Sequence, residues 1–160
     1  MKSKKIIIVS HCVLNQNSVV EGWARAKGAY PIAALLLDEG VGIIQLPCPE
    51  MAYKGLGRPP LGYDDYNEPA YKTLCCDLVR PIVMQLKDYL KSGYVLTGII
   101  AIENSPTCAI SGRRGVLMEV LLPMLVKDRI TVPFVEIPET YREGGSHKEL
   151  EKELIKLIRS

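Results

Sequence analysis

The 160-residue sequence lacks the features that mark several large classes of proteins. Its formal net charge is only +2, so its charge alone gives no reason to expect a nucleic-acid or membrane partner. No apolar run approaches the roughly 18 residues of a membrane-spanning helix. The basic start MKSKK precedes a short apolar run, shorter than the core of about 7–15 residues in a secretion signal. We therefore expect a cytoplasmic protein without a membrane or nucleic-acid partner.

Several local motifs are missing as well. No internal repeat or low-complexity tract divides the chain, so we expect one α/β domain over residues 1–160. No G-x-G-x-x-G or P-loop follows the first apolar run, which argues against a nucleotide-binding domain whose cysteines only fill the core. The five cysteines form no C-x-x-C pair. In a reducing compartment we expect them to be free thiols and not a disulfide scaffold.

Short apolar segments alternate with longer segments of helical periodicity. The apolar segments predict strands, and the periodic ones predict helices, the last with a capping box of Ser146 and Glu149. We expect strands at residues 5–9, 41–46, 96–102 and 131–135, and helices near 31–38, 69–92, 115–127 and after 146. Residues 48–69 are rich in glycine and proline and predict an irregular loop.

The predicted strands are apolar throughout rather than alternating in polarity. This pattern is typical of a parallel sheet that is covered on both faces. We expect a three-layer α/β fold, Rossmann-like or flavodoxin-like, with a mainly parallel sheet of four strands or slightly more. In such sheets, ligands bind at the carboxyl ends of the strands, near the point where the strand order reverses.

Three of the five cysteines follow three successive strands of this sheet. Cys12, Cys48 and Cys108 each lie in a polar or proline-rich loop just past a predicted strand. A single free cysteine is usually a small buried apolar residue, and Cys75, on the apolar side of a helix, fits that role. Cys76 has no assigned role. Because parallel strands end at one edge, we expect the other three thiols to converge on one crevice.

A trio of thiolates can hold zinc with an open position or an iron–sulfur cluster with one open iron. Ligand softness favours the iron–sulfur cluster without deciding between them. His11 is adjacent to Cys12, and neighbouring residues on an extended chain point to opposite faces, so we expect its ring to point away. Trp23 and Tyr30 have side chains that could wall a pocket, but we expect an ordinary core position for both.

Three segments together resemble a known family. The motifs SHCVLNQNS, LPCPE and NSPTC are similar to those of the thiouracil desulfurase superfamily, formerly a family of unknown function, and most of all to its divergent branch of desulfidases. The resemblance implies a 4Fe–4S cluster held by Cys12, Cys48 and Cys108. It also implies non-redox desulfuration of a small thiolated substrate with release of sulfide.

The resemblance also implies an acid and a serine that assist the reaction. Here it suggests Ser105 and a carboxylate, with Glu50 as first choice and Glu103 and Glu136 as alternatives. For Glu50 a solvated loop position, and for Ser105 a turn-forming role, are equally compatible with the sequence.

The substrate-contacting segments differ from those of thiouracil desulfurase. Relatives continue the first motif with an Arg-Tyr-Asp-Gly-like stretch and the second with Gly-Gly-Leu-x-x-Pro-Arg, whereas this chain has NQNSVVEG and MAYKGLGRPP. Candidate substrate contacts are Asn15, Asn17 and Arg58, although Asn17 also fits a helix cap. The resemblance thus leaves the substrate open among small thiolated compounds.

A second interpretation uses the same three cysteines without catalysis. The chain would then be a non-enzymatic carrier of an iron–sulfur cluster or of sulfur, and it would need the cysteines but neither Glu50 nor Ser105. Under both interpretations, a homo-oligomer is compatible with the sequence.

Overall fold

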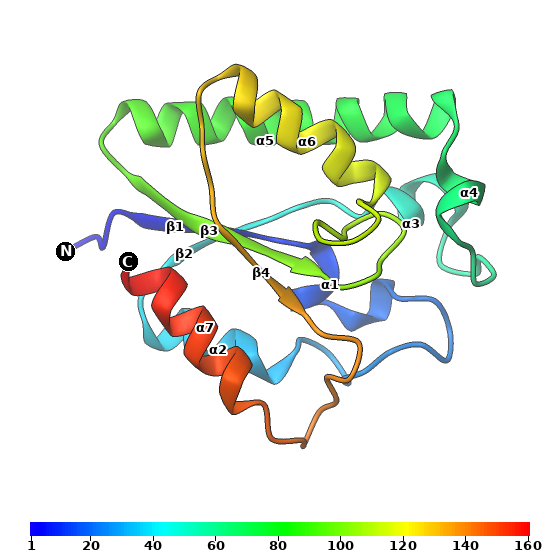
Figure 1. Cartoon of the computed structure of the whole chain (residues 1–160), viewed down its shortest axis with the longest axis horizontal. Helices are drawn as coiled ribbons and strands as arrows, with labels where there is room; N and C mark the ends of the chain where they lie inside the picture. The colour runs from blue at the N-terminus through cyan, green and yellow to red at the C-terminus, as the bar shows by residue number, and fades with distance from the viewer.

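The four strands form one parallel sheet, as the sequence predicts. The computed structural model describes residues 1–160 (Figure 1). The strands lie in the order β2-β1-β3-β4, and every neighbouring pair is parallel. Their bounds are β1 Lys5–Val9, β2 Gly42–Gln45, β3 Val95–Ile102 and β4 Phe134–Ile137. The predicted three-layer α/β fold of the Rossmann-like or flavodoxin-like kind is confirmed.

Helices cover both faces of the sheet, two on each side (Figure 1). They are α5 (Pro69–Lys91) and α6 (Val116–Lys127) on one face, and α2 (Ala34–Asp38) and α7 (Lys148–Arg159) on the other. Residues of β1 alternate between the two cores, with Ile6 and Ile8 under α5 and α6, and Ile7 and Val9 under α2 and α7. Both faces of β1 are therefore buried, which explains its continuous apolar sequence.

The segment at residues 48–69, predicted as irregular, contains two short helices. They are α3 (Pro49–Lys54) and α4 (Tyr63–Tyr66). Pro49 occupies the first position of α3, where its missing N–H costs no hydrogen bond. Asp65 accepts the N–H of Gly62 at 2.9 Å and so caps α4. Local capping thus forms helices where glycine and proline content alone predicted none.

Two predicted boundaries near the carboxyl end are wrong. β4 begins at Phe134, three residues later than expected, because only Phe134–Ile137 pairs with β3. The Ser146–Glu149 capping box does not form, since His147 occupies the N-cap of α7 without a side-chain cap. His147 instead stacks on Tyr141, with ring centroids 4.1 Å apart. An aromatic contact six residues away thus takes the place of the local cap.

The strand order reverses between β1 and β3. The chain leaves β1 toward β2 on one side, and β3 later joins β1 on the other. The loops that follow β1 and β3 therefore diverge above the sheet edge, which is the usual ligand position in open α/β sheets. The loop after β1 contains α1 (His11–Leu14) and the single turn η1 (Gln16–Ser18), and η2 (Pro31–Ala33) leads into α2. None of the helices combines the length and the apolar character needed to cross a bilayer.

Candidate functional site

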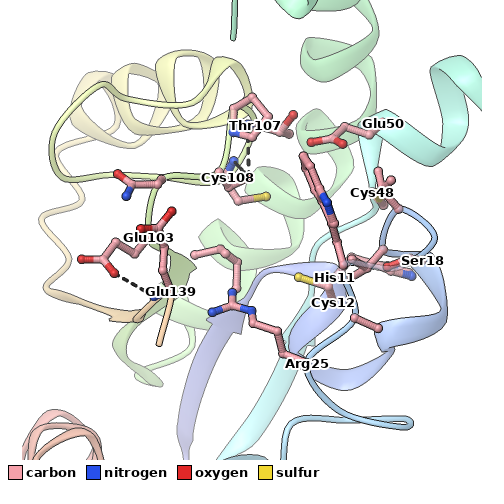
Figure 2. Close-up of a pocket in the computed structure, with 18 of the residues that line it drawn as sticks. His11, Cys12, Ser18, Arg25, Cys48, Glu50, Glu103, Thr107, Cys108 and Glu139 are labelled. Carbon is pink, nitrogen blue, oxygen red and sulfur yellow. Dashed lines mark hydrogen bonds between the residues drawn. The ribbon is translucent and has the colours of Figure 1, made fainter. Parts of the chain in front are cut away.

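A pocket of about 480 Å³ lies at this edge of the sheet. The segments that follow β1, β2, β3 and β4 all contribute to its lining, which includes Cys12, Cys48 and Cys108. In Figure 2 the sulfur atoms of Cys12 and Cys108 point into the same space, and Cys48 borders it from the side of α3. The structure therefore brings the three cysteines to one pocket.

Cys12 lies in α1, a single helical turn, and not on an extension of β1. The expectation that His11 and Cys12 alternate on an extended chain is therefore wrong, and both residues line the pocket. His11 Nδ1 lies 3.1 Å from the carbonyl oxygen of Leu46. Because a carbonyl can only accept, the proton of the neutral ring sits on Nδ1 and Nε2 is left as an acceptor. Gln16 Nε2 donates to the Cys12 carbonyl at 2.9 Å and braces the turn.

Cys48 occupies the N-cap of α3. The backbone N–H of Met51 donates to Cys48 Sγ at 3.4 Å, so the sulfur takes the place of the oxygen of an ordinary N-cap. An N–H directed at sulfur favours the thiolate over the thiol. The local sequence C-P-E thus fixes the direction of the Cys48 side chain through the start of the helix.

Cys108 is positioned by a tight turn after β3. Ser105 Oγ accepts the backbone N–H groups of Thr107 at 3.2 Å and Cys108 at 3.0 Å. The returning chain passes so close that a Cβ on Gly115 would collide with the backbone of Thr107. The N–H of Val116 donates to the carbonyl of Pro106 at 3.0 Å, which ties the start of α6 to the same turn. Ser105 therefore has the turn-forming role that the sequence allowed.

The three thiols share a poorly solvated environment. Burial raises the pKa of Cys12 to about 12, and it raises the pKa of Cys48 and Cys108 above the ordinary thiol value as well. A charge on Cys48 would raise the pKa of Cys12 further, and charges on both would raise that of Cys108. Neutral thiols are weak nucleophiles, so a role as free cysteine nucleophiles is disfavoured.

Ser10 adds one polar contact to this environment. Its Oγ is the one buried side-chain oxygen or nitrogen that has no regular hydrogen-bond partner. It nevertheless lies beside Cys108 and lowers the pKa of that thiol. Since the geometry is not that of a regular hydrogen bond, we regard this as a weak polar contact. A thiolate at Cys108 would strengthen it.

The three thiols form a donor set of the kind that can hold a cluster. No three histidine, cysteine or carboxylate side chains of the chain gather closely enough to hold one metal ion. A 4Fe–4S cluster spreads its thiolate ligands over different irons and needs a wider arrangement. Three soft sulfur donors around one pocket, together with the partnerless Ser10 hydroxyl beside them, are compatible with such a group.

Glu50 and Arg58 form a nearly buried ion pair at the pocket wall. Their side chains are 15% and 3% exposed, and Arg58 Nε lies 3.3 Å from Glu50 Oε1. Arg58 also donates to the carbonyl oxygens of Gly55 at 3.0 Å and Ser18 at 2.8 Å. Tyr66 Oη donates to the same Glu50 oxygen at 3.4 Å. All three guanidinium nitrogens of Arg58 are thus occupied, which suits a structural role better than substrate binding.

The other predicted residues divide into two groups. Asn15 and Asn17 do not line the pocket, because Asn15 Oδ1 accepts the N–H of Asn17 at 3.1 Å and caps η1. Glu136 does not line it either, since its carboxylate accepts the N–H of Ile110 at 2.9 Å. Glu103 does line it and accepts the backbone N–H of Glu139 at 2.8 Å (Figure 2).

Trp23 and Arg25 also line the pocket, and neither was among the candidate site residues of the sequence. Trp23 is 55% exposed at the pocket, so the expectation that it is a core residue is wrong, whereas Tyr30 is buried as expected. Arg25 Nη1 donates to the carbonyl of Pro138 at 2.5 Å, and the guanidinium lies 5.5 Å from the ring centroid of Tyr30. Their position in the irregular segment after the first cysteine motif was the available signal, because loops next to a rigid sheet often bind ligands.

Comparison with known proteins places the chain in a family. It is 43% identical over 154 residues to the uncharacterized protein MJ0003 of Methanocaldococcus jannaschii, an alignment that covers 95% of this chain and 98% of the relative. The chain belongs to the MJ0003 family. No protein-family model and no solved structure matches it. The name of this relative states no activity.

Proposed function

We propose that the protein is an iron–sulfur-dependent desulfidase, a member of the thiouracil desulfurase superfamily that removes sulfur from a small thiolated compound without net redox change. The observation that carries the proposal is the meeting of three cysteines from three separate strands in one pocket that also contains Glu50 and Ser105. Cys75 is the one cysteine that is fully buried in the core, whereas Cys12, Cys48 and Cys108 line the pocket, which supports a shared role for these three.

Cys12, Cys48 and Cys108 would hold a 4Fe–4S cluster. When bound, the cluster would supply an iron with an open coordination position and an affinity for the sulfur of the substrate. The thiols must lose their protons on binding, and burial opposes that loss in the empty protein. The N–H of Met51 and the hydroxyl of Ser10 would offset part of this cost by supporting the sulfur atoms of Cys48 and Cys108.

Glu50 is the candidate general base. Its Oε1 is occupied by Arg58 and Tyr66, while Oε2 has no protein partner. Every fully buried side-chain oxygen or nitrogen except Ser10 Oγ has a hydrogen-bond partner. Since Oε2 has no partner, it must be in contact with solvent. It can therefore take a proton from a water that adds to the carbon of the C–S bond. The carbon would keep the water oxygen as the C–S bond breaks, and Glu50 would return its proton to the departing sulfur. The second water proton would leave that oxygen as the carbonyl forms, so that the products are the carbonyl compound and hydrogen sulfide.

Ser105 is the candidate proton donor. Both lone pairs of Oγ accept backbone N–H groups, those of Thr107 and Cys108. The hydroxyl proton has no other acceptor assigned and can point into the pocket, which Ser105 lines. Ser105 would thus position the substrate or relay a proton while it also holds the turn that carries Cys108.

The structural partners of these two residues also favour a second candidate, a carrier of a cluster or of sulfur. Arg58 holds Glu50 beside α3, and Ser105 holds the Cys108 turn. Contrary to the expectation from the sequence, a protein that only carries a cluster would therefore also use Glu50 and Ser105, as supports for its cysteine loops. Catalysis by Glu50 and Ser105 therefore has to be tested separately from cluster binding.

Anaerobic iron–sulfur reconstitution of single variants tests the cluster. We expect Cys12→Ser, Cys48→Ser and Cys108→Ser to lose most of the bound iron and sulfide, because each removes one of three thiolate ligands. Cys76→Ser is the matched control, since Cys76 is partly exposed, lies outside the pocket and should load like the parent. A parent protein that loads no cluster, or equal loading of all four variants, would sink the cluster proposal.

Glu50→Gln separates the enzyme from the carrier. The variant should load the cluster, yet release sulfide from thiolated substrates about 10²- to 10⁴-fold more slowly, as expected for loss of a general base. Unchanged sulfide release by a fully loaded Glu50→Gln protein would contradict the catalytic role and favour the carrier.

A further inference from the structure

Arg25 is a cation in the pocket without a carboxylate partner. The ion pairs of the structure involve four other arginines, at positions 58, 80, 113 and 159. The two lysine pairs do not include Arg25 either. In Figure 2 its side chain reaches into the space between Cys12 and the Glu103–Glu139 contact. A partly buried arginine with its charge unpaired is costly to retain, so its free edge calls for a ligand.

The hydrogen bonds of Arg25 leave one edge of the guanidinium open. Nη1 donates to the carbonyl of Pro138, and the guanidinium also makes a weak polar contact with the Tyr30 hydroxyl, which acts to lower the pKa of that phenol. Nε and Nη2 make no regular hydrogen bond in the protein. Every fully buried side-chain oxygen or nitrogen except Ser10 Oγ has a hydrogen-bond partner. Because Nε and Nη2 have none, both must be in contact with solvent, and Arg25 lines the pocket. Nε–H and Nη2–H point the same way from the planar group, and this edge matches the two oxygens of a carboxylate.

The position of Arg25 is fixed before any ligand arrives. Its backbone N–H donates to Gln16 Oε1 at 2.9 Å, and Gln16 in turn donates to the carbonyl of Cys12. The carbonyl of Arg25 accepts the N–H of Glu143 at 2.9 Å, and the guanidinium lies near the Tyr30 ring. A ligand group bound to Arg25 is therefore held at a set place relative to Cys12, at little ordering cost.

Two further features of the lining describe the ligand. Trp23 is largely exposed at the pocket and offers an aromatic face on which a planar group can stack. Glu103, Glu139 and the exposed Arg142 also line the pocket, and Arg142 Nη1 donates to the carbonyls of Glu139 and Tyr141. With Arg25 these groups bring two positive and two negative charges, so a second negative charge on the ligand would have no unbalanced cation to meet. The lining thus favours a planar molecule with one carboxylate over a neutral ring and over a phosphate dianion.

We propose that the substrate is a planar thiolated compound with a single carboxylate, and that Arg25 binds this carboxylate through Nε and Nη2. The inference rests on the proposed function for the sulfur that is removed. The carboxylate site itself consists of protein groups and can be measured with ligands that contain no sulfur.

Two matched ligand pairs test this inference by titration calorimetry on the full chain. One pair is 2-thiouracil and 2-thiouracil-6-carboxylate, measured on the cluster-loaded protein. The other is uracil and uracil-6-carboxylate, measured with and without the cluster. We expect the carboxylate to tighten binding about 10- to 100-fold in both pairs, the range of a charge-assisted bidentate contact. Arg25→Gln should lose this gain, and Arg114→Gln, an exposed arginine outside the pocket, should keep it.

The single tryptophan of the chain supplies an independent signal. Trp23 emission should change on binding of uracil-6-carboxylate to the parent protein, because no other tryptophan contributes. Equal affinity for the neutral and carboxylate ligands, or an equal loss for both in Arg25→Gln, would overturn the inference. A larger gain from uridine 5′-phosphate over uridine than from the carboxylate would also overturn it. If no cluster loads but the uracil pair still shows the gain, the proposed function fails and the carboxylate site stands.

Discussion

Arg58 and Arg25 border the same pocket, yet their hydrogen bonding differs completely. Arg58 is almost fully buried and gives all three guanidinium nitrogens to protein acceptors, one of them the carboxylate of Glu50. Arg25 is partly exposed and gives one side-chain nitrogen to a carbonyl. The comparison shows that proximity to a pocket does not by itself identify a binding residue. The number of hydrogen-bond donors that the protein leaves unoccupied is the better criterion.

The difference has a physical origin in desolvation. A buried guanidinium is tolerated when acceptors in the protein replace the water it has lost, and Arg58 meets this condition without a ligand. Arg25 retains contact with solvent through the pocket, so water or a ligand can supply the acceptors that the protein does not. Arg58 should therefore contribute to folding and Arg25 to recognition, and the following measurements separate these two roles.

The largest expected effect is the loss of stability in Arg58→Met. Removing this guanidinium leaves the Glu50 carboxylate and the carbonyls of Gly55 and Ser18 without their donor, so we expect the free energy of unfolding to fall by about 3–5 kcal/mol. Arg25→Met should cost about 1 kcal/mol or less, because one hydrogen bond to Pro138 is lost. Denaturant unfolding measures both, and similar losses for the two variants would contradict the comparison.

Glu50→Gln should have an intermediate effect on stability. The amide oxygen can still accept from Arg58, but the charge of Arg58 is then unbalanced, and we expect a loss of about 1–2 kcal/mol. Glu103→Gln is the matched control, since Glu103 lines the same pocket without an ion pair. The same denaturant measurement applies. A Glu50→Gln protein no less stable than Glu103→Gln would show that the Arg58–Glu50 pair does not support the fold.

The smallest effect concerns pH. Burial, followed by the charge of Glu50, raises the pKa of Tyr66 above its ordinary value of about 10. The folded state therefore holds the phenolic proton more tightly, and its contribution is complete below pH 10 and lost as the pH rises further. This linkage amounts to about 0.4 kcal/mol at pH 10 and grows by up to about 1.4 kcal/mol per additional pH unit. Unfolding measured from pH 8 to 11 should show a steeper decline for the parent than for Tyr66→Phe. Equal slopes would show that the phenol stays accessible to base.

Much of the fold could be predicted because its signals are local. The run Ile6–Val9 predicts β1, and the spacing of Tyr71, Cys75 and Leu86 predicts α5, because continuous and 3.6-residue apolar patterns reflect burial on two faces or one. The convergence of three cysteines followed from parallel strands whose carboxyl ends share an edge.

The errors arose where side-chain and strand contacts that no sequence pattern expresses outweigh the expected local preference. The stacking of His147 on Tyr141 takes the place of the Ser146 cap, and pairing with β3 shifts the start of β4. Asn15 and Asn17 were candidate substrate contacts, but one caps the other beside the pocket. Arg58 was a candidate contact for substrate, but in the structure it binds Ser18 and Glu50. Tertiary packing brings these partners together, and no spacing in the sequence indicates it.

The sequence by itself determined the α/β class, the buried strands and the ordered trio of cysteine motifs. These follow from side-chain polarity at fixed local spacing, which the chain carries before it folds. Only the tertiary structure decided which side chains around the cysteines are already satisfied and which are open. That distinction separates Arg25 from Arg58, because hydrogen-bond saturation depends on acceptors such as Pro138 and Ser18 that approach from distant parts of the chain.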